Sequence, residues 1–295
     1  MKVGIVLPQG LQGEYRGWAP ERAWHRTVEL ARRAEHLGFE SIWLYDHVQT
    51  FGSARDEPSF EAMAMLGALA AETGRVRLGP LVACVGYRNP ALLAKLSSTL
   101  DVISGGRFEL GIGAGLKSDE ALAYGFGFPA IADRMTLLRD SLEILIRMLE
   151  PGHATYEGER VRVADAINDP KGLQSPRIPI VVGGNGPNAT WRIAARYADE
   201  LNVDGLSPDA VRDGLPVIRA RCEEAGRDPG TLAVSVHLGG AEIAVAGPGR
   251  VARLAAYREL GIRRVMASLP ASVNDDDALE SFAADAAAAG AILEF

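Results

Sequence analysis

The hydrophobic positions of this chain fall into two alternating patterns. Short runs of β-branched and other apolar residues, such as VGIVLP at 3–8, are typical of buried strands. Between these runs lie longer stretches with apolar residues three or four positions apart, which is the spacing of one helix face. In residues 131–149 this apolar face consists of leucine and isoleucine: Leu137, Leu138, Leu142, Leu145, Ile146 and Leu149. The pattern therefore predicts alternating strands and helices.

Eight strand–helix units follow one another along the chain. We expect strands at 3–8, 41–48, 76–85, 107–115, 177–184, 200–205, 232–238 and 263–270. We expect helices at 21–37, 59–73, 90–104, 131–149, 188–198, 208–226, 249–261 and 277–289. A unit of about 37 residues matches the size of a (β/α)8 barrel. Because no Pro- or Ser-rich linker divides the chain, we expect one α/β domain over residues 1–295, a TIM barrel with an insertion before its fifth strand.

Residues 150–176 form that insertion. The segment ATYEGERVRV at 154–163 is typical of a small hairpin around Glu157-Gly158, and the remainder is a polar loop. Loops of this length are uncommon in compact domains unless they are functional or mobile. Two interpretations stay open, which are a lid over the active site and a decoration that covers one end of the barrel.

Charge and composition exclude several classes of protein. The net formal charge is −7 and the sequence pI is about 5.4, which argues against a nucleic-acid-binding protein. The apolar runs are shorter than the roughly 20 residues of a membrane span, and the first residues resemble a strand more than a signal peptide. Cys84 and Cys222 are too far apart for a paired metal or redox motif. We expect a cytoplasmic protein without a metal site or a membrane partner.

Asp46 and His47 end the second predicted strand and are the strongest acid–base candidates. Barrels of this kind carry their active sites at the C-terminal ends of the strands. An imidazole titrates near neutral pH, and a nearby carboxylate shifts its pKa. Neighbouring strand residues point to opposite faces, so the two side chains need not touch, and they could instead bind loop backbone. Tyr15 and Trp18, after the first strand, are candidates for the wall of a substrate pocket.

Two glycine clusters also follow strands. The GIGAG segment at 111–115 lacks the full spacing of a dinucleotide fingerprint. The GGNGPNAT segment at 183–190 can turn backbone N–H groups toward an anion, and the helix after Pro187 would present its positive end there. A phosphate or carboxylate site is one interpretation of this segment. The other is a tight turn capped by Asn188.

The remaining histidines and cysteines are weaker candidates. His237 could face the barrel mouth, and Cys84 could line a pocket, whereas Cys222 is more typical of a core position. Three other histidines are more typical of surface or packing positions: His25, His36 and His153. The chain contains no GxSxG, HExxH or P-loop motif, so it lacks the parts of a serine hydrolase, a zinc hydrolase or an NTPase.

Several segments together resemble a known family. They are GFESIWLYDHV (38–48), VRLGPLVACVGYRNPALLAKLSSTLDVISGGRFELGIGAG (76–115), IPIVVGGNGP (178–187) and RIAARYAD (192–199). They resemble the luciferase-like monooxygenase superfamily of flavin- and deazaflavin-dependent barrels. Within it, the chain is similar to the coenzyme F420-dependent oxidoreductases, which include methylenetetrahydromethanopterin reductase-like proteins.

The resemblance implies which residues lie beside the cofactor. Asp46 and His47 match residues next to the cofactor ring, where His47 would hydrogen-bond near the reacting centre or exchange a proton. Leu81-Val82 matches a bulge that often holds a non-prolyl cis peptide behind the ring, and Cys84 matches a nearby small polar residue. The remaining matches are to loops along the ribityl chain and phosphate: Gly113, Ala114 and Gly115 in one loop, and Gly183, Gly184, Asn185 and Gly186 in the other.

The chain departs from the family pattern at Leu116. Many relatives carry Trp there, and a sugar-phosphate dehydrogenase of the superfamily carries Glu, so Leu116 argues against that activity. Glu120 and Tyr124 do fit the broader family pattern.

The resemblance implies an F420-dependent oxidoreductase that transfers a hydride between the deazaflavin and a small organic substrate. One alternative is an FMN-dependent, two-component monooxygenase that receives reduced flavin from a reductase partner. A second alternative is a barrel that binds a cofactor without turnover. Because relatives are often dimers, we also expect a homodimer.

Overall fold

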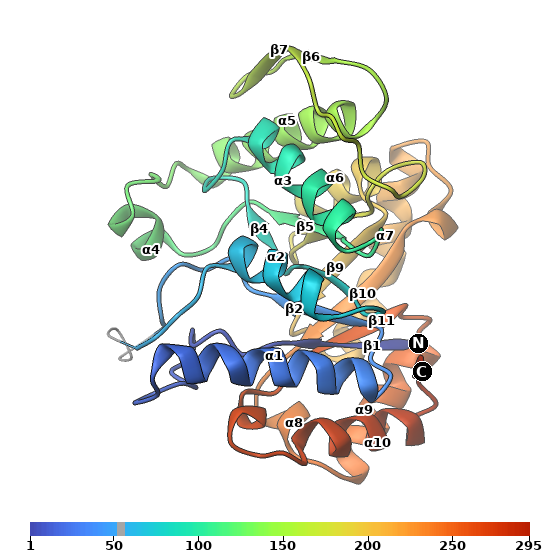
Figure 1. Cartoon of the computed structure of the whole chain (residues 1–295). Helices are drawn as coiled ribbons and strands as arrows, with labels where there is room; N and C mark the ends of the chain where they lie inside the picture. Colours follow the sequence, from blue (N-terminus) through green and yellow to red (C-terminus); the bar gives the residue numbers. More distant parts are fainter. Residues whose placement is uncertain (52–56) are drawn as a thin grey trace.

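The predicted strands pair side by side into a nearly closed parallel barrel in the computed structural model, which describes residues 1–51 and 57–295 (Figure 1). The order around the barrel is β3 (Arg77–Pro80), β2 (Ser41–Leu44), β1 (Lys2–Val6), β11 (Arg264–Ser268), β10 (Ala233–Leu238), β9 (Glu200–Asp204), β8 (Ile180–Gly183), β5 (Leu110–Gly113) and β4 (Ala83–Cys84). All neighbouring pairs are parallel. The predicted α/β barrel is confirmed.

The third predicted strand, 76–85, is wrong as a continuous element. It is split into β3, which pairs with β2, and β4, which pairs with β5. The peptide bond between Leu81 and Val82, at the break, is cis, as the family resemblance implied. A bridge between Leu78 and Phe108 joins β3 to the segment before β5. The strand is interrupted because its first half bonds to β2 and its second half bonds to β5, the neighbouring strands on its two sides.

Helices cover the outside of the barrel. They are α1 (Pro20–His36), α2 (Ala62–Glu72), α3 (Pro90–Ile103), α4 (Ser118–Ala123), α5 (Ile131–Leu149), α6 (Thr190–Tyr197), α7 (Pro208–Glu224), α8 (Ala241–Ala244), α9 (Pro248–Glu259) and α10 (Ala278–Ala288), with short 3-10 helices at Pro229–Thr231 and Pro270–Val273. We did not predict α4 and α8, because segments this short carry no helical stripe. No helix in the described part of the chain is long and apolar enough to cross a membrane.

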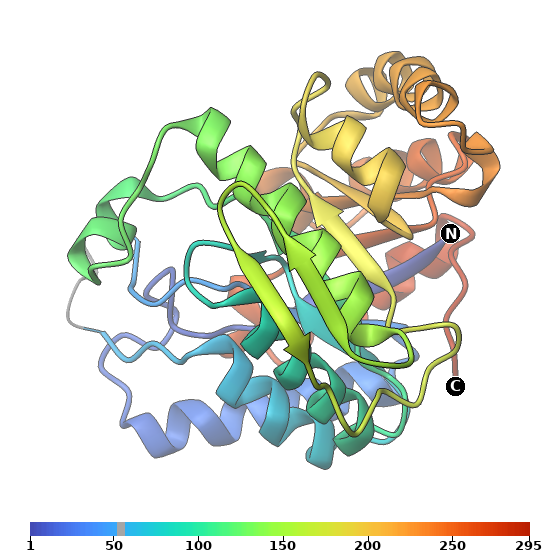
Figure 2. The same cartoon turned by 90° about the horizontal axis from the view of Figure 1, so that it is seen from above.

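The insertion contains the predicted hairpin, built from β6 (Ala154–Glu157) and β7 (Arg162–Ala166). The hairpin lies against the outer side of α5 (Figures 1 and 2). The following loop returns to the N-terminal end of the strands, where Gln174 bonds to Arg77 and to the backbone oxygen of Phe108. This half of the insertion lies away from the barrel mouth, and the action of the hairpin as a lid stays a prediction.

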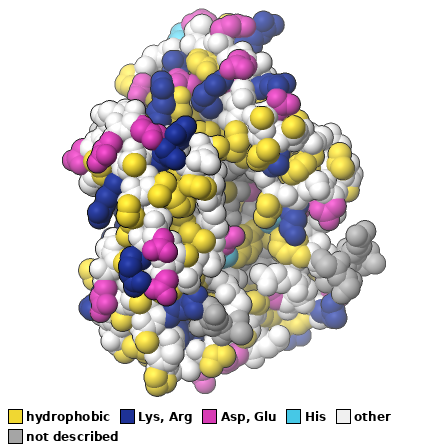
Figure 3. Space-filling model, turned by 180° about the vertical axis from the view of Figure 1, so that it is seen from behind, with side chains coloured by type: hydrophobic (Ala, Val, Ile, Leu, Met, Phe, Trp, Pro, Cys, Tyr) yellow, Lys and Arg dark blue, Asp and Glu magenta, His cyan; other side chains and the backbone are white. Residues whose placement is uncertain are grey.

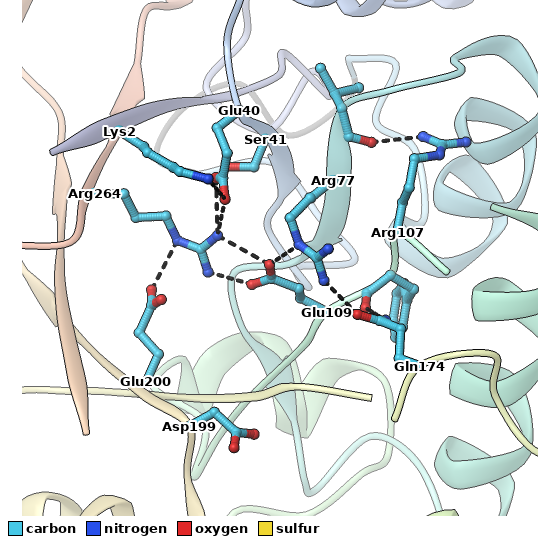
Figure 4. A network of polar contacts seen from close by, with 12 residues as sticks. Lys2, Glu40, Ser41, Arg77, Arg107, Glu109, Gln174, Asp199, Glu200 and Arg264 are labelled. Atoms are coloured by element: carbon cyan, nitrogen blue, oxygen red, sulfur yellow. Dashed lines mark hydrogen bonds and ion pairs between the residues drawn. The ribbon is translucent and has the colours of Figure 1, made fainter. Parts of the chain in front are cut away.

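The barrel interior has two layers of different chemistry. Toward the mouth lies an apolar cluster of Val6, Trp43, Leu81, Val181 and Met266, with Tyr45 and Val82 packed against it. At the N-terminal ends of the strands, the fully buried Arg264 binds three buried carboxylates (Figure 4). Their contacts run from Nε to Glu200 (3.0 Å), from Nη1 to Glu40 (3.1 Å) and from Nη2 to Glu109. An ionic layer therefore fills the lower end of the barrel.

Candidate active site

Asp46 lies two residues after the end of β2 and is held by the last residue of β4 and by the loop that follows it. Its Oδ2 atom accepts hydrogen bonds from the backbone N–H of Cys84 (2.8 Å) and from Nη1 of Arg88 (2.6 Å). Burial raises the pKa of this carboxyl group, and the contact with Arg88 opposes that rise. The other oxygen, Oδ1, is buried without a hydrogen-bond partner among the described residues. Because an unpaired buried acceptor is costly, Oδ1 marks a place where a bound molecule can donate a hydrogen bond.

His47 bonds to a different partner, Glu120 of α4. The distance from Nδ1 of His47 to Oε2 of Glu120 is 2.8 Å. The imidazole also packs edge-on against Phe51, with ring centres 4.7 Å apart. The sequence predicted that Asp46 and His47 need not touch, and the two side chains indeed bind separate groups on either side of the strand end.

Glu120 is a buried carboxylate, and its hydrogen bonds go to His47 and to the loops around it. It accepts hydrogen bonds from the hydroxyl of Tyr87 (2.6 Å) and from the backbone N–H groups of Val48 (2.7 Å) and Gln49 (3.1 Å). Although burial alone would raise its pKa, the hydrogen bonds from His47 and Tyr87 lower the pKa to about 2. Because an ionised carboxylate only accepts, Nδ1 of His47 carries a proton and Nε2 is left for a bound molecule.

The family pattern had pointed to Glu120 and Tyr124, but the sequence did not indicate their contacts with the loop around His47. The Tyr124 hydroxyl donates to the backbone oxygen of Val48 (2.8 Å). Both contacts depend on the unpredicted helix α4. Leu116, the position that departs from the family pattern, has a side chain that is 77% exposed.

Val82 sits in a notch made by two of the predicted cofactor-binding glycines. A Cβ atom on Gly113 would lie 2.7 Å from Val82 Cγ2, and one on Gly183 would lie 2.9 Å from Val82 Cγ1. Real Cβ contacts are almost never this short, so β5 and β8 need glycine here to admit Val82. These two glycines therefore have a packing role that the sequence did not reveal. Together with Tyr45, Val82 forms the partly buried floor of the barrel mouth.

Gly113→Ala is expected to destabilise the protein by roughly 1–3 kcal/mol, because the new methyl group overpacks the notch. Gly67→Ala is the matched control. Its Cβ would meet only Leu100, at 3.8 Å, within helix α2. That change should stabilise the protein by about 0.5–1 kcal/mol. Urea unfolding measures the free energy of unfolding of both variants. Equal effects of the two substitutions would show that Val82 does not require glycine at position 113.

Cys84 lies between Asp46 and the loop after β5. Burial raises the pKa of its thiol to about 11, so the group is a neutral thiol near pH 7. It lines a cavity of about 310 Å³ with Tyr87, Ala114 and Arg134. Nη1 of Arg134 donates to the backbone oxygens of Ala114 (3.3 Å) and Gly115 (2.5 Å), and this fixes the loop. Val161, from the hairpin, also borders this cavity.

The loop after β8 keeps two free backbone donors. The side chain of Asn185 is bound to the backbone of Asp204, donating to its oxygen (2.7 Å) and accepting from its N–H (2.8 Å). The backbone N–H groups of Asn185 and Gly186 have no hydrogen-bond partner within the described part of the chain. The alternative of a cap by Asn188 is wrong, since Ala189 is the cap residue and the Asn188 oxygen accepts from Arg221. The interpretation of this loop as an anion site rests on those two N–H groups.

Tyr15 does not line a substrate pocket, contrary to our prediction. It is fully buried, with its hydroxyl 2.5 Å from Oγ1 of Thr27, and its ring packs against Trp18 and Phe60. Trp18 lines a separate surface pocket with Arg22 stacked over its ring. The aromatic spacing after the first strand therefore reflects packing against α1.

His237, a weak candidate from the sequence, lies at the mouth between two partners. Its Nε2 atom is 2.7 Å from the Tyr45 hydroxyl, and its Nδ1 atom is 2.6 Å from Oδ1 of Asp204. The three residues come from the C-terminal ends of β10, β2 and β9. Only the tertiary structure brings them together, because they are far apart in sequence.

Figure 3 shows a face of the molecule that is hollowed near its centre, with hydrophobic side chains around the hollow. Among the described residues, no group of three His, Cys, Asp or Glu side chains could hold a metal ion.

A family model described as luciferase-like monooxygenase matches residues 1–246. An F420-dependent glucose-6-phosphate dehydrogenase from Kineococcus radiotolerans is 32% identical over 227 residues, covering 76% of this chain and 66% of that protein. A 5,10-methylenetetrahydromethanopterin reductase from Methanopyrus kandleri is 29% identical over 223 residues, covering 72% of this chain and 66% of the relative. The chain thus spans slightly less than two thirds of the length of these relatives.

Solved structures also share the fold. An F420-dependent secondary alcohol dehydrogenase, solved with an F420–acetone adduct, superposes with a TM-score of 0.81 at 19% identity, covering 98% of both chains. At this identity the likeness shows a common barrel architecture.

Proposed function

Because this chain belongs to the luciferase-like monooxygenase family, we propose that it is a coenzyme F420-dependent oxidoreductase acting on a small organic substrate. The observation that carries the proposal is the unpaired, buried Oδ1 atom of Asp46, whose other oxygen binds the backbone of Cys84, two residues after the Leu81–Val82 break. Relatives named as F420-dependent enzymes support the choice of cofactor. When bound, the deazaflavin accepts or supplies a hydride.

The residues at the mouth fit such a group. Val82 offers an apolar surface in the notch between Gly113 and Gly183, against which a flat ring can lie. Oδ1 of Asp46 can accept a hydrogen bond from a ring N–H. The free backbone N–H groups of Asn185 and Gly186 suit a phosphate, because oriented backbone donors bind anions. We assign these residues, with Leu81, Cys84, Ala114, Gly115 and Gly184, to the cofactor site.

His47 is the residue we place at the substrate. Glu120 fixes the orientation of its ring through Nδ1, so Nε2 can hydrogen-bond the reacting oxygen and hold it toward the cofactor. Glu120 itself is 1% exposed and fully engaged, and it therefore orients His47 without reaching the substrate.

The exposed, uncharged Leu116 bears on the substrate class. Since the sugar-phosphate dehydrogenase pattern has Glu at this position, we propose a substrate other than a sugar phosphate. A panel that includes glucose 6-phosphate, secondary alcohols and aldehydes tests this point, and efficient turnover of glucose 6-phosphate would contradict it.

Parallel titration of the purified protein with F420 and FMN, each oxidised and reduced, tests the cofactor. We expect F420 to bind with micromolar or tighter affinity and FMN at least about tenfold more weakly, a difference of about 1.4 kcal/mol. Fluorescence or calorimetry gives both dissociation constants.

A preference for FMN would instead favour the two-component monooxygenase and a flavin reductase partner. Binding of F420 with no hydride transfer to any panel substrate would favour a barrel that holds a cofactor without turnover. Sedimentation of the same samples tests the proposed homodimer.

A further inference from the structure

Tyr45 stands on the floor of the barrel mouth. Its ring packs on the apolar interior cluster next to Val82, the residue we assign to the back of the cofactor ring. Its hydroxyl contacts Nε2 of His237 at 2.7 Å and also Ser268. Tyr45, Asp46 and His47 follow β2 one after another, so all three lie at the C-terminal end of this strand, which is the end that forms the mouth of the barrel.

The hydrogen bonds that link Tyr45, His237 and Asp204 have a definite direction. The hydrogen bond from His237 is the main cause that lowers the pKa of Asp204, which is therefore a carboxylate near neutral pH and can only accept. His237 must then donate from Nδ1, which leaves Nε2 as the acceptor of the Tyr45 O–H. Burial raises the pKa of Tyr45 to about 12, so its hydroxyl stays protonated until it exchanges its proton with a neighbour.

The Asp204 end of this hydrogen-bond chain is open to solvent. Tyr45 is partly buried, the His237 side chain is 15% exposed and the Asp204 side chain is 66% exposed. The pair of His47 and Glu120 is different, because the Glu120 side chain is buried and gives His47 no hydrogen-bonded path to solvent. The hydrogen bonds from Tyr45 through His237 to Asp204 therefore connect the floor of the mouth with bulk water.

We propose that Tyr45 is a catalytic residue that exchanges a proton with the substrate oxygen, and that His237 and Asp204 are positioning residues that connect it to solvent. This inference rests on the proposed function, since hydride transfer to or from a carbonyl carbon requires a proton at its oxygen.

The proton steps balance in both directions. In reduction, a hydride from the reduced deazaflavin forms the new C–H bond while the C=O π bond breaks, and the oxygen takes the Tyr45 proton. This direction starts from the imidazolium form of His237, whose Nε2–H replaces the proton that Tyr45 gave up, and the imidazole regains a proton from water before the next turnover. In oxidation, the alcohol proton passes to Tyr45 as the Tyr45 proton passes to His237, and the hydride leaves for the oxidised deazaflavin.

Tyr45→Phe and His237→Gln test the relay in full-length protein loaded with F420. The panel above supplies the substrates, and hydride transfer is followed by the absorbance of the coenzyme. We expect Tyr45→Phe to lower kcat by roughly 100-fold or more, as loss of general acid–base catalysis does, with F420 affinity changed less than about threefold. His153→Gln is the matched control, because His153 forms the same kind of pair with Asp165 on the exposed hairpin.

The pH profile separates a relay from a structural role. The wild-type pH profile of kcat should contain a limb that belongs to the relay, and His237→Gln should remove that limb. The charged or titratable groups whose electrostatic effects reach the residues of this relay are Asp204, Tyr45 and Glu14. Asp204→Asn should move the limb, whereas His153→Gln should leave it unchanged.

Histidine NMR tests the hydrogen-bond chain without turnover. Tyr45→Phe should shift the His237 ring signals and leave those of His153 in place. If His237 does not respond, or if turnover and the pH limb survive in both variants, the relay is wrong although the proposed function stands. If the wild type does not bind F420 or transfers no hydride to the panel, both proposals fail.

Discussion

Arg264→Met is expected to destabilise the barrel by about 3–5 kcal/mol, because it removes a fully buried cation that binds three buried carboxylates. The guanidinium bonds to Glu40, Glu109 and Glu200 and lies over the Trp43 ring, 4.8 Å from its centre. Methionine fills a similar volume but leaves buried negative charge without a partner. Arg77 and Lys2 lie at the edge of this layer and compensate only part of it.

Urea unfolding at pH 8 and at pH 5 measures this effect. Burial by itself raises the pKa of Glu109, yet Arg264 and Arg77 lower it to about 2, so its stabilising effect is present above its ordinary pKa of 4.5 and disappears as the pH falls toward 2. Without Arg264 the carboxylates should bind protons at higher pH, and the variant should lose less stability at pH 5 than at pH 8.

Arg162→Met is the matched control for Arg264→Met, because Arg162 pairs with Glu157 on the exposed hairpin, with both side chains more than three-quarters exposed. That pair should contribute less than about 1 kcal/mol. A second variant, in which Glu200→Gln accompanies Arg264→Met, should recover part of the loss. If Arg264→Met costs no more than Arg162→Met, the ionic layer does not support the barrel.

His47→Ala is expected to lower kcat by about 100-fold or more while F420 binding changes little. The reason is the position of Nε2, which is the free atom of a ring that Glu120 holds in place. Glu120→Gln should have a smaller effect in the same direction, since an amide can accept one hydrogen bond from His47 but carries no charge. Steady-state kinetics with F420 titration of each variant makes the comparison.

His36→Ala, at the end of α1, is the control for His47→Ala and should retain wild-type turnover. Unchanged turnover in His47→Ala would refute the role we give to this residue. Loss of F420 binding together with turnover would instead place His47 in the cofactor site.

Much of the candidate site could be predicted from the chain, but its contacts could not. Asp46 and His47 are recognisable because strand ends form the mouth of a barrel. Their partners Arg88 and Glu120 come from a loop and from a short helix without a stripe of its own. The prediction that Tyr15 lines the substrate pocket is wrong because packing decides whether an aromatic residue in a loop faces the mouth or α1, and the sequence pattern does not show that packing.

The apolar pattern predicts the strands and helices of the barrel, because a period of two or of 3.6 residues in apolar positions is a local property of each segment. The sequence also determined which strand ends carry acid–base groups and glycines. Only the tertiary structure decided what these groups do. The role of Gly113 and Gly183 depends on Val82 from the break between β3 and β4, and Arg264 depends on three glutamates at the N-terminal ends of β2, β5 and β9. The line from Tyr45 to Asp204 likewise exists only once the barrel closes, because closure brings residues nearly 200 positions apart into hydrogen-bond contact.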